Sequence, residues 1–535
     1  MLRLLRTARH LKPIQITNRI ARRFVRPRVW SGETPPFKAC TRRWETVAAL
    51  PASIIDSETA CFLNEPGPLL EWQNPDKSHL WLYNLHYFDD LHAEHAAQRA
   101  ALHRELIGHW LQANPASGGV GWEPYPTSLR IVNWVKWLLA GNEPVPGMLT
   151  SLFQQAHGLS QQLEYHLEGN HLLANAKALV FVGSCFEGGA AEGWLSKGLS
   201  LLDEQHREQL LPDGAHFELS PMYHSIILMD VLDIIQLGQC YRGGKLGEMA
   251  ETLRGRAATM ASWLKGMLQP DGEIPFFNDA AFGIAPRPQA ILDYVHKLGV
   301  TRPVTNEPTQ HYDASGYVAV RRYGQVALLD VAAIGPDYIP GHAHADTLSF
   351  EWSLHGQRVL VNSGISEYGV SEERLRQRGT AAHNTVVVNG EDSSEVWSGF
   401  RVARRAKPFG MQLRQEGDDI VVQASHDGYR RLRPKVDHHR AWRVAPGLLE
   451  INDRVEGRFR SAVAYYHLHP DVNAVLIGET VELLLPGGER CKLNVEGGYL
   501  AVEGGTWHPE FGLSIPNKHV AVSFQGANLC TTLRY

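Results

Sequence analysis

Hydrophobic and polar positions follow two different periods along the chain of 535 residues. From about residue 85 to 300, apolar side chains recur every three or four positions, as in 102–111, which is the spacing of one helix face. Ser220-Pro221 forms an N-cap followed by proline and predicts a helix over 222–237, and Ser128 is the expected N-cap of another helix. Short breaks containing Gly, Pro or Asn divide this region into about nine helical segments.

From about residue 312 the period changes to two. The segment 347–354 alternates polar and apolar residues throughout and predicts a half-buried strand, with His355-Gly356 as a turn and 357–361 as the returning strand. Further predicted strands lie at 317–321, 326–332, 385–388, 420–424, 448–453, 462–467, 480–485 and 499–502. Many short strands joined by Gly and Asp turns are typical of an antiparallel β-sandwich.

These patterns predict an α+β multidomain protein with three parts. A basic N-terminal arm covers 1–45, a helical domain covers 46–305, and an antiparallel β-sandwich covers 306–535, with the linker between Pro303 and Pro308. No segment reaches the ~20 uninterrupted apolar residues of a membrane-spanning helix. The six cysteines are scattered without a Cys-x-x-Cys pair, which favours free thiols in a reducing compartment.

Charge is distributed unevenly along the chain. The formal net charge is −5, but residues 1–32 carry nine Lys or Arg and no acid, so the remainder carries −14. The acidic balance excludes a generally basic nucleic-acid binder. Leucine and isoleucine alternate with the arginines of the arm, so the arm either rests on an anionic membrane surface or folds against the acidic body. It lacks the continuous apolar core of a secretory signal, so we expect a cytoplasmic protein, peripheral to the inner membrane if the arm binds lipid.

Polar residues gather directly before two predicted strands. If the run from Gly341 to Asp346 extends the strand at 347, then His342, His344 and Asp346 lie on one face, as a metal site or an acid/base cluster requires. His383 could complete a metal site with His344. Asn362 would be a poor third ligand, because a neutral amide oxygen binds zinc more weakly than a carboxylate does.

Two further clusters lie at predicted helix starts. Glu168-Gly169-Asn170-His171 precedes a helix over 172–182, where Asn170 is either functional or an N-cap. Tyr223 lies in the first turn of the helix that Ser220 opens. There the positive end of the helix dipole and a nearby cation could ease phenol ionisation, although a buried tyrosine with a satisfied hydroxyl is the alternative.

In four places the chain resembles the heparinase II/III-like polysaccharide lyases. The matching motifs are Gly169-Asn170-His171-Leu172-Leu173-Ala174-Asn175, Ser220-Pro221-Met222-Tyr223-His224, Gly341-His342-Ala343-His344-Ala345-Asp346 and Ala382-His383-Asn384-Thr385. The resemblance covers residues from about 80 to 535. It implies an N-terminal α/α toroid, an incomplete barrel of helix pairs, followed by a C-terminal antiparallel β-sandwich. The basic arm is similar to that of members encoded with exopolysaccharide or lipopolysaccharide biosynthesis.

The resemblance also implies a reaction, the β-elimination of a uronic-acid-containing polysaccharide, with an acidic polysaccharide as the partner. Asn170 resembles the amide that hydrogen-bonds the substrate carboxylate, and Tyr223 resembles the residue that acts as base, acid or both. His171 and His342 resemble the histidines that share proton transfer and charge neutralisation. Residues expected to contact substrate are Trp122, Glu168, Glu218, His224, Arg378 and Asn384. Because Asn170 and Tyr223 belong to the helical domain and His342 to the β domain, an active cleft must lie between the two domains.

The family's structural zinc site is implied in the β domain. His344 and His383 match two of its ligands, but the third is normally aspartate and here is Asn362. The asparagine at this position weakens the prediction of a zinc site more than it weakens the prediction of catalysis.

Two other functions stay open from the sequence. One is a glycoside hydrolase on a similar toroid, which would use two carboxylates such as Glu123, Glu168 or Glu218. The other is a non-catalytic polysaccharide-binding or assembly protein of an export system. Because the body is acidic, a lyase of a polyanion also needs local positive charge, and we expect the arginines of 374–378 and 401–405 to line the cleft.

Overall fold

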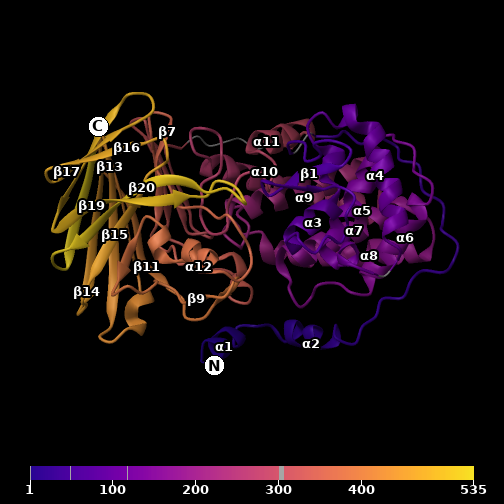
Figure 1. Ribbon diagram of the computed structural model, residues 1–535, viewed down its shortest axis with the longest axis horizontal. Helices are drawn as coiled ribbons and strands as arrows, with labels where there is room; N and C mark the ends of the chain where they lie inside the picture. Colours follow the sequence, from indigo (N-terminus) through magenta and orange to yellow (C-terminus); the bar gives the residue numbers. More distant parts are fainter. Residues whose placement is uncertain (1, 48–49, 117, 301–306) are drawn as a thin grey trace.

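The computed structural model describes residues 2–47, 50–116, 118–300 and 307–535, and its helical and β-sheet halves lie side by side (Figure 1). Within these residues the helical half has nine α-helices, the number expected. They are α3 (His79–Tyr87), α4 (Ala100–Ala113), α5 (Pro124–Leu139), α6 (Met148–Ser160), α7 (Gly169–Cys185), α8 (Gly189–Gln209), α9 (Pro221–Cys240), α10 (Gly244–Met267) and α11 (Pro288–Lys297). The predicted domain boundary and residues 303–306 of the predicted linker lie outside the described residues.

The helices form an inner and an outer layer. Every residue of α7 except His171 is buried, and most of α5 and α9 is buried as well. By contrast, α8 and α10, which pack on α7 and α9, keep one exposed face. Layered helix pairs of this kind build the expected α/α toroid, and the inner helices carry the residues that face its centre.

Helix α5 begins earlier than predicted. Pro124 occupies the first helical position, and the Ser128 hydroxyl donates to the Pro124 carbonyl over 2.8 Å, one turn inside the helix. The prediction that Ser128 caps the helix was wrong, because a serine hydroxyl can also bond back to the carbonyl four residues earlier.

The β half is a sandwich of antiparallel sheets, as predicted. One sheet has eight strands in the order β11-β12-β13-β14-β21-β18-β17-β16, and it faces a four-stranded sheet (β19-β20-β15-β8) and a five-stranded sheet (β3 to β7) across a shared apolar core. The five-stranded sheet comprises β3 (Thr309–Tyr312), β4 (Tyr317–Arg322), β5 (Gln325–Asp330), β6 (Phe350–Leu354) and β7 (Gln357–Leu360). The four-stranded sheet comprises β8 (Val386–Val388), β15 (Ala462–His467), β19 (Gly498–Trp507) and β20 (Ile515–Phe524). The large sheet comprises β11 (Pro408–Glu416), β12 (Asp419–His426), β13 (Val436–Ala445), β14 (Leu448–Gly457), β16 (Asn473–Ile477), β17 (Thr480–Leu484), β18 (Arg490–Glu496) and β21 (Asn528–Arg534).

Strand β6 corrects the expectation of a half-buried strand. Its apolar side chains enter the sandwich core, but its polar side chains are buried too. Glu351 accepts hydrogen bonds from the Phe276 amide (2.9 Å) and the Gln269 side chain (2.9 Å), both in the helical half. The polar face of β6 therefore packs against the helical half. A period of two indicates that the two faces of a strand differ in polarity, but it does not show whether the polar face meets protein or solvent.

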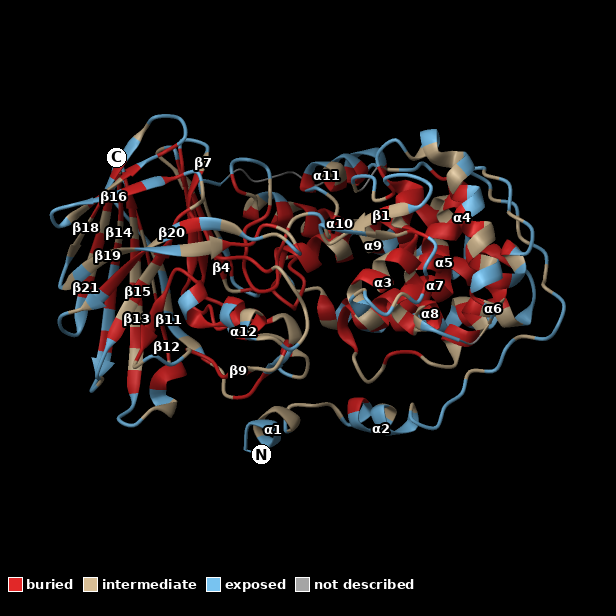
Figure 2. Cartoon of the chain, viewed as in Figure 1, coloured by how far each residue is buried: buried red, intermediate tan, exposed pale blue. Residues whose placement is uncertain are grey.

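Smaller elements lie around these two halves. They are the hairpin β1 (Thr59–Phe62) and β2 (Glu65–Pro68), the pair β9 (Val396–Trp397) and β10 (Arg401–Val402), and helices α1 (Leu2–Ala8), α2 (Pro13–Ala21) and α12 (Glu372–Arg378). Helices α1 and α2 run along the outside of both halves and are largely exposed (Figure 2). Among the described residues, no helix combines the length and the apolar character needed to cross a bilayer.

Candidate active site

Tyr223 and His342 meet where the two halves join. Tyr223 lies in the first turn of α9, where its amide donates to the Ser220 side chain over 3.2 Å, as the N-cap prediction required. His342 ends a short 3₁₀ turn (Pro340–His342) of the β half. The centroids of the two rings lie 4.0 Å apart, so the two groups expected to share a cleft are in contact.

Asp279 holds His342 in place. The Nδ1–H of His342 donates to one carboxylate oxygen over 2.8 Å, and the Nε2–H of His344 donates to the other over 2.7 Å. The Arg374 guanidinium, on α12, donates to both oxygens over 2.5 and 2.6 Å. Burial alone would raise the pKa of Asp279, but Arg374 and the two histidines outweigh it and hold this pKa well below its usual range. Asp279 is therefore an ionised anchor, and it leaves Nε2 of His342 free to accept a proton.

The expected strand geometry of this cluster was wrong. The residues around His342 form a 3₁₀ turn and a loop, and β6 begins only at Phe350. His342 and His344 converge because both bond to Asp279, whereas Asp346 accepts from the Asn278 amide over 3.2 Å. Neither Asp279 nor its role was predicted, since it lies in a loop between α10 and α11 with no periodic pattern around it.

Asn170 and Glu218 lie on the other side of His342. The Asn170 side-chain nitrogen lies 3.4 Å from both carboxylate oxygens of Glu218, which is long for a hydrogen bond, and Glu218 lies 3.7 Å from His342 Nε2. Asn170 belongs to the first turn of α7 and is not its N-cap, which is Glu168. Burial raises the pKa of Glu218. The site therefore favours the protonated carboxyl over an unpaired carboxylate at this position.

The hydroxyl of Tyr223 has a partner that the sequence did not reveal. It lies 2.9 Å from the hydroxyl of Tyr368, which belongs to the β half. Burial and this second phenol raise the pKa of Tyr223 well above its usual value. The expectation that the helix dipole eases ionisation of Tyr223 was wrong, because burial of the phenol dominates.

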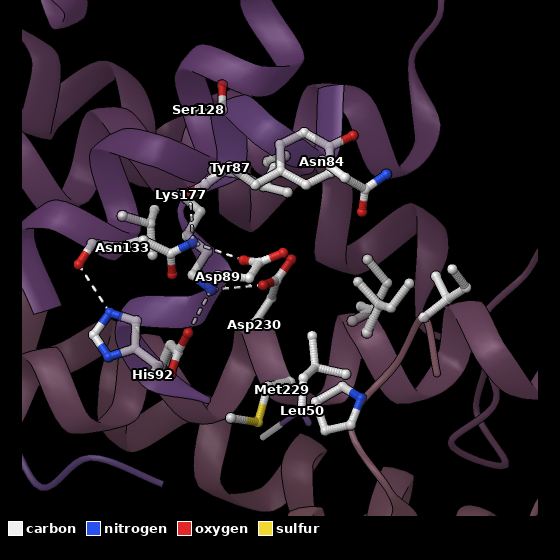
Figure 3. A pocket seen from close by; sticks show the side chains of 18 of the residues that line it. Leu50, Asn84, Tyr87, Asp89, His92, Ser128, Asn133, Lys177, Met229 and Asp230 are labelled. Carbon is white, nitrogen blue, oxygen red and sulfur yellow. Dashed lines mark hydrogen bonds and ion pairs between the residues drawn. The ribbon is translucent and has the colours of Figure 1, made fainter. Parts of the chain in front are cut away.

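A cavity of about 250 Å³ lies beside Tyr223 and Asn170 and extends along α7 and α9; His342, Asp279 and Glu218 are not among the residues that line it. Asn170, Tyr223 and Tyr368 are among the residues that line it. Lys177 and Asp230 line it as well, and Figure 3 shows these two side chains together. Lys177 follows Asn170, and Asp230 follows Tyr223, by seven residues along α7 and α9, a rise of about 10.5 Å.

Lys177 donates to Asp230 over 2.6 Å and to Asp233 over 2.5 Å, and Lys136 pairs with Asp233 over 2.6 Å. These charges therefore largely neutralise one another. No sequence pattern predicted these ion pairs, because their members come from three different helices: Lys136 from α5, Lys177 from α7 and both aspartates from α9.

His171 is placed apart from this centre. Its Nδ1 lies 3.3 Å from Glu164, its ring lies 4.4 Å from that of Tyr125, and its side chain is about one third exposed. Tyr125 lines the cavity, so His171 borders the site, but its hydrogen bond and ring contact are with Glu164 and Tyr125 and not with Tyr223 or His342.

Four residues expected to contact substrate do not line this cavity. The Trp122 indole donates to the Asn114 carbonyl over 3.3 Å and does not line the cavity, and His224 is buried with Nε2 3.0 Å from the Met260 carbonyl. The prediction for His224 was wrong, because a buried imidazole can make its hydrogen bond with a backbone carbonyl of the core. Contact of Trp122 with substrate stays a prediction.

Arg378 and Asn384 are fully buried and donate to backbone carbonyls, Arg378 to Ala343 over 2.8 Å and Asn384 to Phe350 over 2.8 Å. Burial lowers the pKa of Arg378 to about 9. The two side chains tie loops together and cannot reach a substrate, which corrects their assignment.

Glu168 is engaged by the N-terminal arm, since Lys12 lies 2.9 Å from its carboxylate. The expected arginine-lined cleft is also not found within the described chain. Of the two groups, only Arg374 touches the site, through Asp279, whereas Arg404 and Arg405 pair with Glu395 and Asp337.

The residues expected to hold zinc do not fit that ion. His344 Nδ1 and His383 Nε2 lie 3.2 Å apart, but His344 already bonds to Asp279, and the three groups form one hydrogen-bonded chain. The Asn362 side-chain oxygen, which would be the third ligand, is neutral and accepts from the Asn384 amide over 3.3 Å, so it is a poor ligand for zinc. No cluster of three His, Cys, Asp or Glu suited to a metal occurs among the residues that the structure describes.

Family profiles match both halves of the chain. The profile described as Heparinase II/III N-terminus matches residues 142–288, and the one described as Heparinase II/III-like, C-terminal matches residues 304–535. A heparin-sulfate lyase of Bacteroides stercoris is 24% identical over 355 residues, which are 62% of this chain and 51% of that protein. A heparin-sulfate lyase of Bacteroides thetaiotaomicron is 24% identical over 389 residues, which are 63% of this chain and 52% of that protein. The chain spans about half the length of the curated relatives it matches.

A solved structure of heparinase III shares the fold. Its TM-score is 0.68 at 18% identity, and the match covers 88% of this chain and 79% of that one. The likeness confirms the α/α toroid followed by a β-sandwich. With two profiles that match successive regions, the chain belongs to the heparinase II/III-like family.

Proposed function

We propose that the protein is a polysaccharide lyase that cleaves a uronic-acid-containing polysaccharide by β-elimination. The observation that carries this proposal is the ring contact of Tyr223 and His342 at the junction of the two halves, with Tyr223 and Asn170 lining the same cavity. Membership of the family supports it.

Elimination requires three events at one sugar. The carboxylate at C5 is neutralised, the proton at C5 leaves to a base, and O4 takes a proton as the C4–O4 bond breaks and a C4–C5 double bond forms. No water is consumed. The site must therefore supply one base, one acid and one group that pairs with a carboxylate.

His342 is suited to be the base. Because its Nδ1–H donates to Asp279, its Nε2 is the unprotonated nitrogen of the neutral ring and can take the C5 proton. The ionised Asp279 then stabilises the imidazolium that forms. Tyr223 is suited to be the acid, because its raised pKa keeps the phenol protonated until O4 needs the proton.

Asn170 is suited to pair with the substrate carboxylate. Its amide makes only a long contact with Glu218, so exchanging that contact for a substrate oxygen costs little. Glu218, with its raised pKa, can hold a proton and donate a second hydrogen bond to the same carboxylate.

The hydrolase alternative has weaker support. Glu123 is held by Tyr83 and His79, and Glu168 is paired with Lys12, which leaves Glu218 as the one available carboxylate of the three considered. Asp279 also lies in the site, but Arg374 occupies both of its oxygens. Inverting and retaining hydrolases both need two working carboxyl groups.

The test is a panel of uronate polymers, including heparan sulfate, its unsulfated form, alginate and polyglucuronate. Elimination leaves an unsaturated uronate that absorbs in the ultraviolet. We expect at least one polymer to give this product and Tyr223→Phe to lower the rate by about 10²–10⁴-fold. Tyr465→Phe, in β15, is the matched control and should leave the rate unchanged. A wild-type protein that binds polymer but forms no such product would point instead to the binding or assembly role.

A further inference from the structure

The N-terminal arm exposes an unusual amount of apolar surface. Of the 19 large hydrophobic side chains that are exposed in the described chain, nine lie within residues 2–29. They are Leu2, Leu4, Leu5, Ile14, Ile16, Ile20, Phe24, Val25 and Val29, and Phe24 is 80% exposed. Exposed apolar surface gathered in one segment marks a binding surface rather than ordinary surface variation.

Helix α2 is mounted with its polar face toward the protein. Gln15 is buried and donates to the Tyr338 carbonyl over 3.3 Å, and Arg22, two turns along the same face, donates to His166 over 2.9 Å. Ile16 and Ile20 point away from the body, 47% and 56% exposed. A surface helix that only packs on its own protein does the opposite and buries its apolar side.

Polar anchors fix the arm in this orientation at both halves. Lys12 pairs with Glu168 over 2.9 Å and with Glu208 over 2.5 Å in the helical half. In the β half, Arg6 lies 3.6 Å from Glu395, and the Trp397 indole donates to the Thr7 hydroxyl over 3.1 Å. The arm therefore runs along both halves and is largely exposed (Figure 2), and polar contacts hold it there. The nine apolar side chains stay exposed.

The exposed face of the arm is also strongly basic. Six arginines are exposed, namely Arg3, Arg9, Arg19, Arg23, Arg26 and Arg28, and residues 1–32 contain no acid. Isoleucine, leucine and phenylalanine interspersed with arginine fit the boundary between lipid head groups and acyl chains, where apolar groups insert and cations meet anionic phosphates.

We infer that the arm is a docking surface for an anionic lipid membrane. α1, α2 and the segment around Phe24 lie in the interface plane, and the body stays outside the bilayer. Because Lys12 holds Glu168, two residues before Asn170, docking places the lipid on the side of the molecule from which the catalytic helix α7 starts. A polymer carried on or near that membrane would reach the site directly.

Binding of the full chain to vesicles tests this inference. Vesicles of phosphatidylcholine alone are compared with vesicles that contain about 30% phosphatidylglycerol, by co-sedimentation at low and high salt. We expect binding only to the anionic vesicles, weakening as salt rises. Replacing Arg19 and Arg23 by Gln should lower the affinity about fivefold for each arginine removed. Ile16→Glu with Ile20→Glu should lower it by at least tenfold.

The matched control is Ile477→Glu on β16, an equally exposed isoleucine (56%) far from the arm, which should bind as the wild type does. All arm variants should keep wild-type cleavage of soluble polymer, so failure of the docking inference is distinguishable from failure of the proposed lyase activity. Equal binding to neutral vesicles, or anionic binding that both arm variants retain, would overturn the inference. So would an arm that binds soluble acidic polysaccharide or a second copy of the chain instead of vesicles.

Discussion

Replacing Asp279 by asparagine removes the negative charge that holds the side chains of the site together. The carboxylate is fully buried and accepts four N–H donors, two from Arg374 and one each from His342 and His344. Asparagine keeps the shape of the side chain but replaces one acceptor oxygen by an NH₂ group. Arg374 is then left buried without a counter-ion, and His342 loses the partner that fixes its tautomer.

Two magnitudes follow from these contacts. Removing one member of a buried ion pair costs about 3–5 kcal/mol of unfolding free energy, because the other charge stays desolvated. Losing a hydrogen bond to a charged group costs about 1.5–3 kcal/mol, so kcat should fall about 10- to 150-fold if His342 works from this anchor. KM should change little, since Asp279 is buried beneath the histidines and does not line the cavity.

Urea denaturation measures the stability, and the initial rate of unsaturated product measures kcat and KM. Asp437→Asn, which breaks an exposed pair with Arg430, is the control and should cost at most about 1 kcal/mol. A double variant of Asp279→Asn with Arg374→Met should lose less stability than the two single changes added together. If the stability losses of the two single variants add up in the double variant, or if Asp279→Asn keeps the wild-type kcat, Asp279 does not act as the anchor of Arg374 and His342.

Three smaller predictions concern neighbouring groups. Tyr368→Phe removes the partner of the Tyr223 hydroxyl and should lower kcat about two- to tenfold at unchanged stability, and a larger loss would assign Tyr368 a direct part in the chemistry. The free energy of unfolding should fall as the pH drops from 6.5 toward 4, because the histidines that are buried and neutral in the folded protein become protonated in the unfolded chain. A free energy of unfolding that does not change with pH in urea denaturation would contradict this. Burial lowers the pKa to about 3 for each of His86, His92, His206 and His224, so one such histidine costs up to about 2 kcal/mol at pH 5. A chelator should leave the melting temperature unchanged, and elemental analysis should find bound zinc only after Asn362→Asp; stoichiometric zinc in the wild type would contradict the donor chemistry.

Local periodicity predicted the elements of the fold well. The helix that Ser220 opens, the nine-helix region and the strands after residue 312 all follow from spacing and capping, which act over a few residues. The same spacing misread β6, because alternation reports two chemically different faces and not what covers each face. Which half covers the polar face depends on packing between segments far apart in the chain.

The site was predictable only in part for the same reason. Tyr223 and His342 stood out because each lies in a polar motif next to a predicted helix or strand, although the strand after His342 begins only at Phe350. Asp279 and Tyr368, which position them, come from loops that no local pattern links to either residue. Conversely, Arg378 and Asn384 lie in equally polar motifs but bond to backbone carbonyls, a choice that residue type alone does not decide.

Cleavage in ¹⁸O-water is the most direct test of the central claim that this site performs β-elimination. The polymer that the protein degrades is cleaved in labelled water, and the new ends are analysed by mass spectrometry. The account predicts unsaturated uronate at the new non-reducing ends and no label at C1 of the new reducing ends, since the C4–O4 bond breaks, Tyr223 donates a proton to O4 and no water is consumed. Saturated uronate at the new non-reducing ends, together with ¹⁸O at C1 of the new reducing ends, would show hydrolysis and contradict the account.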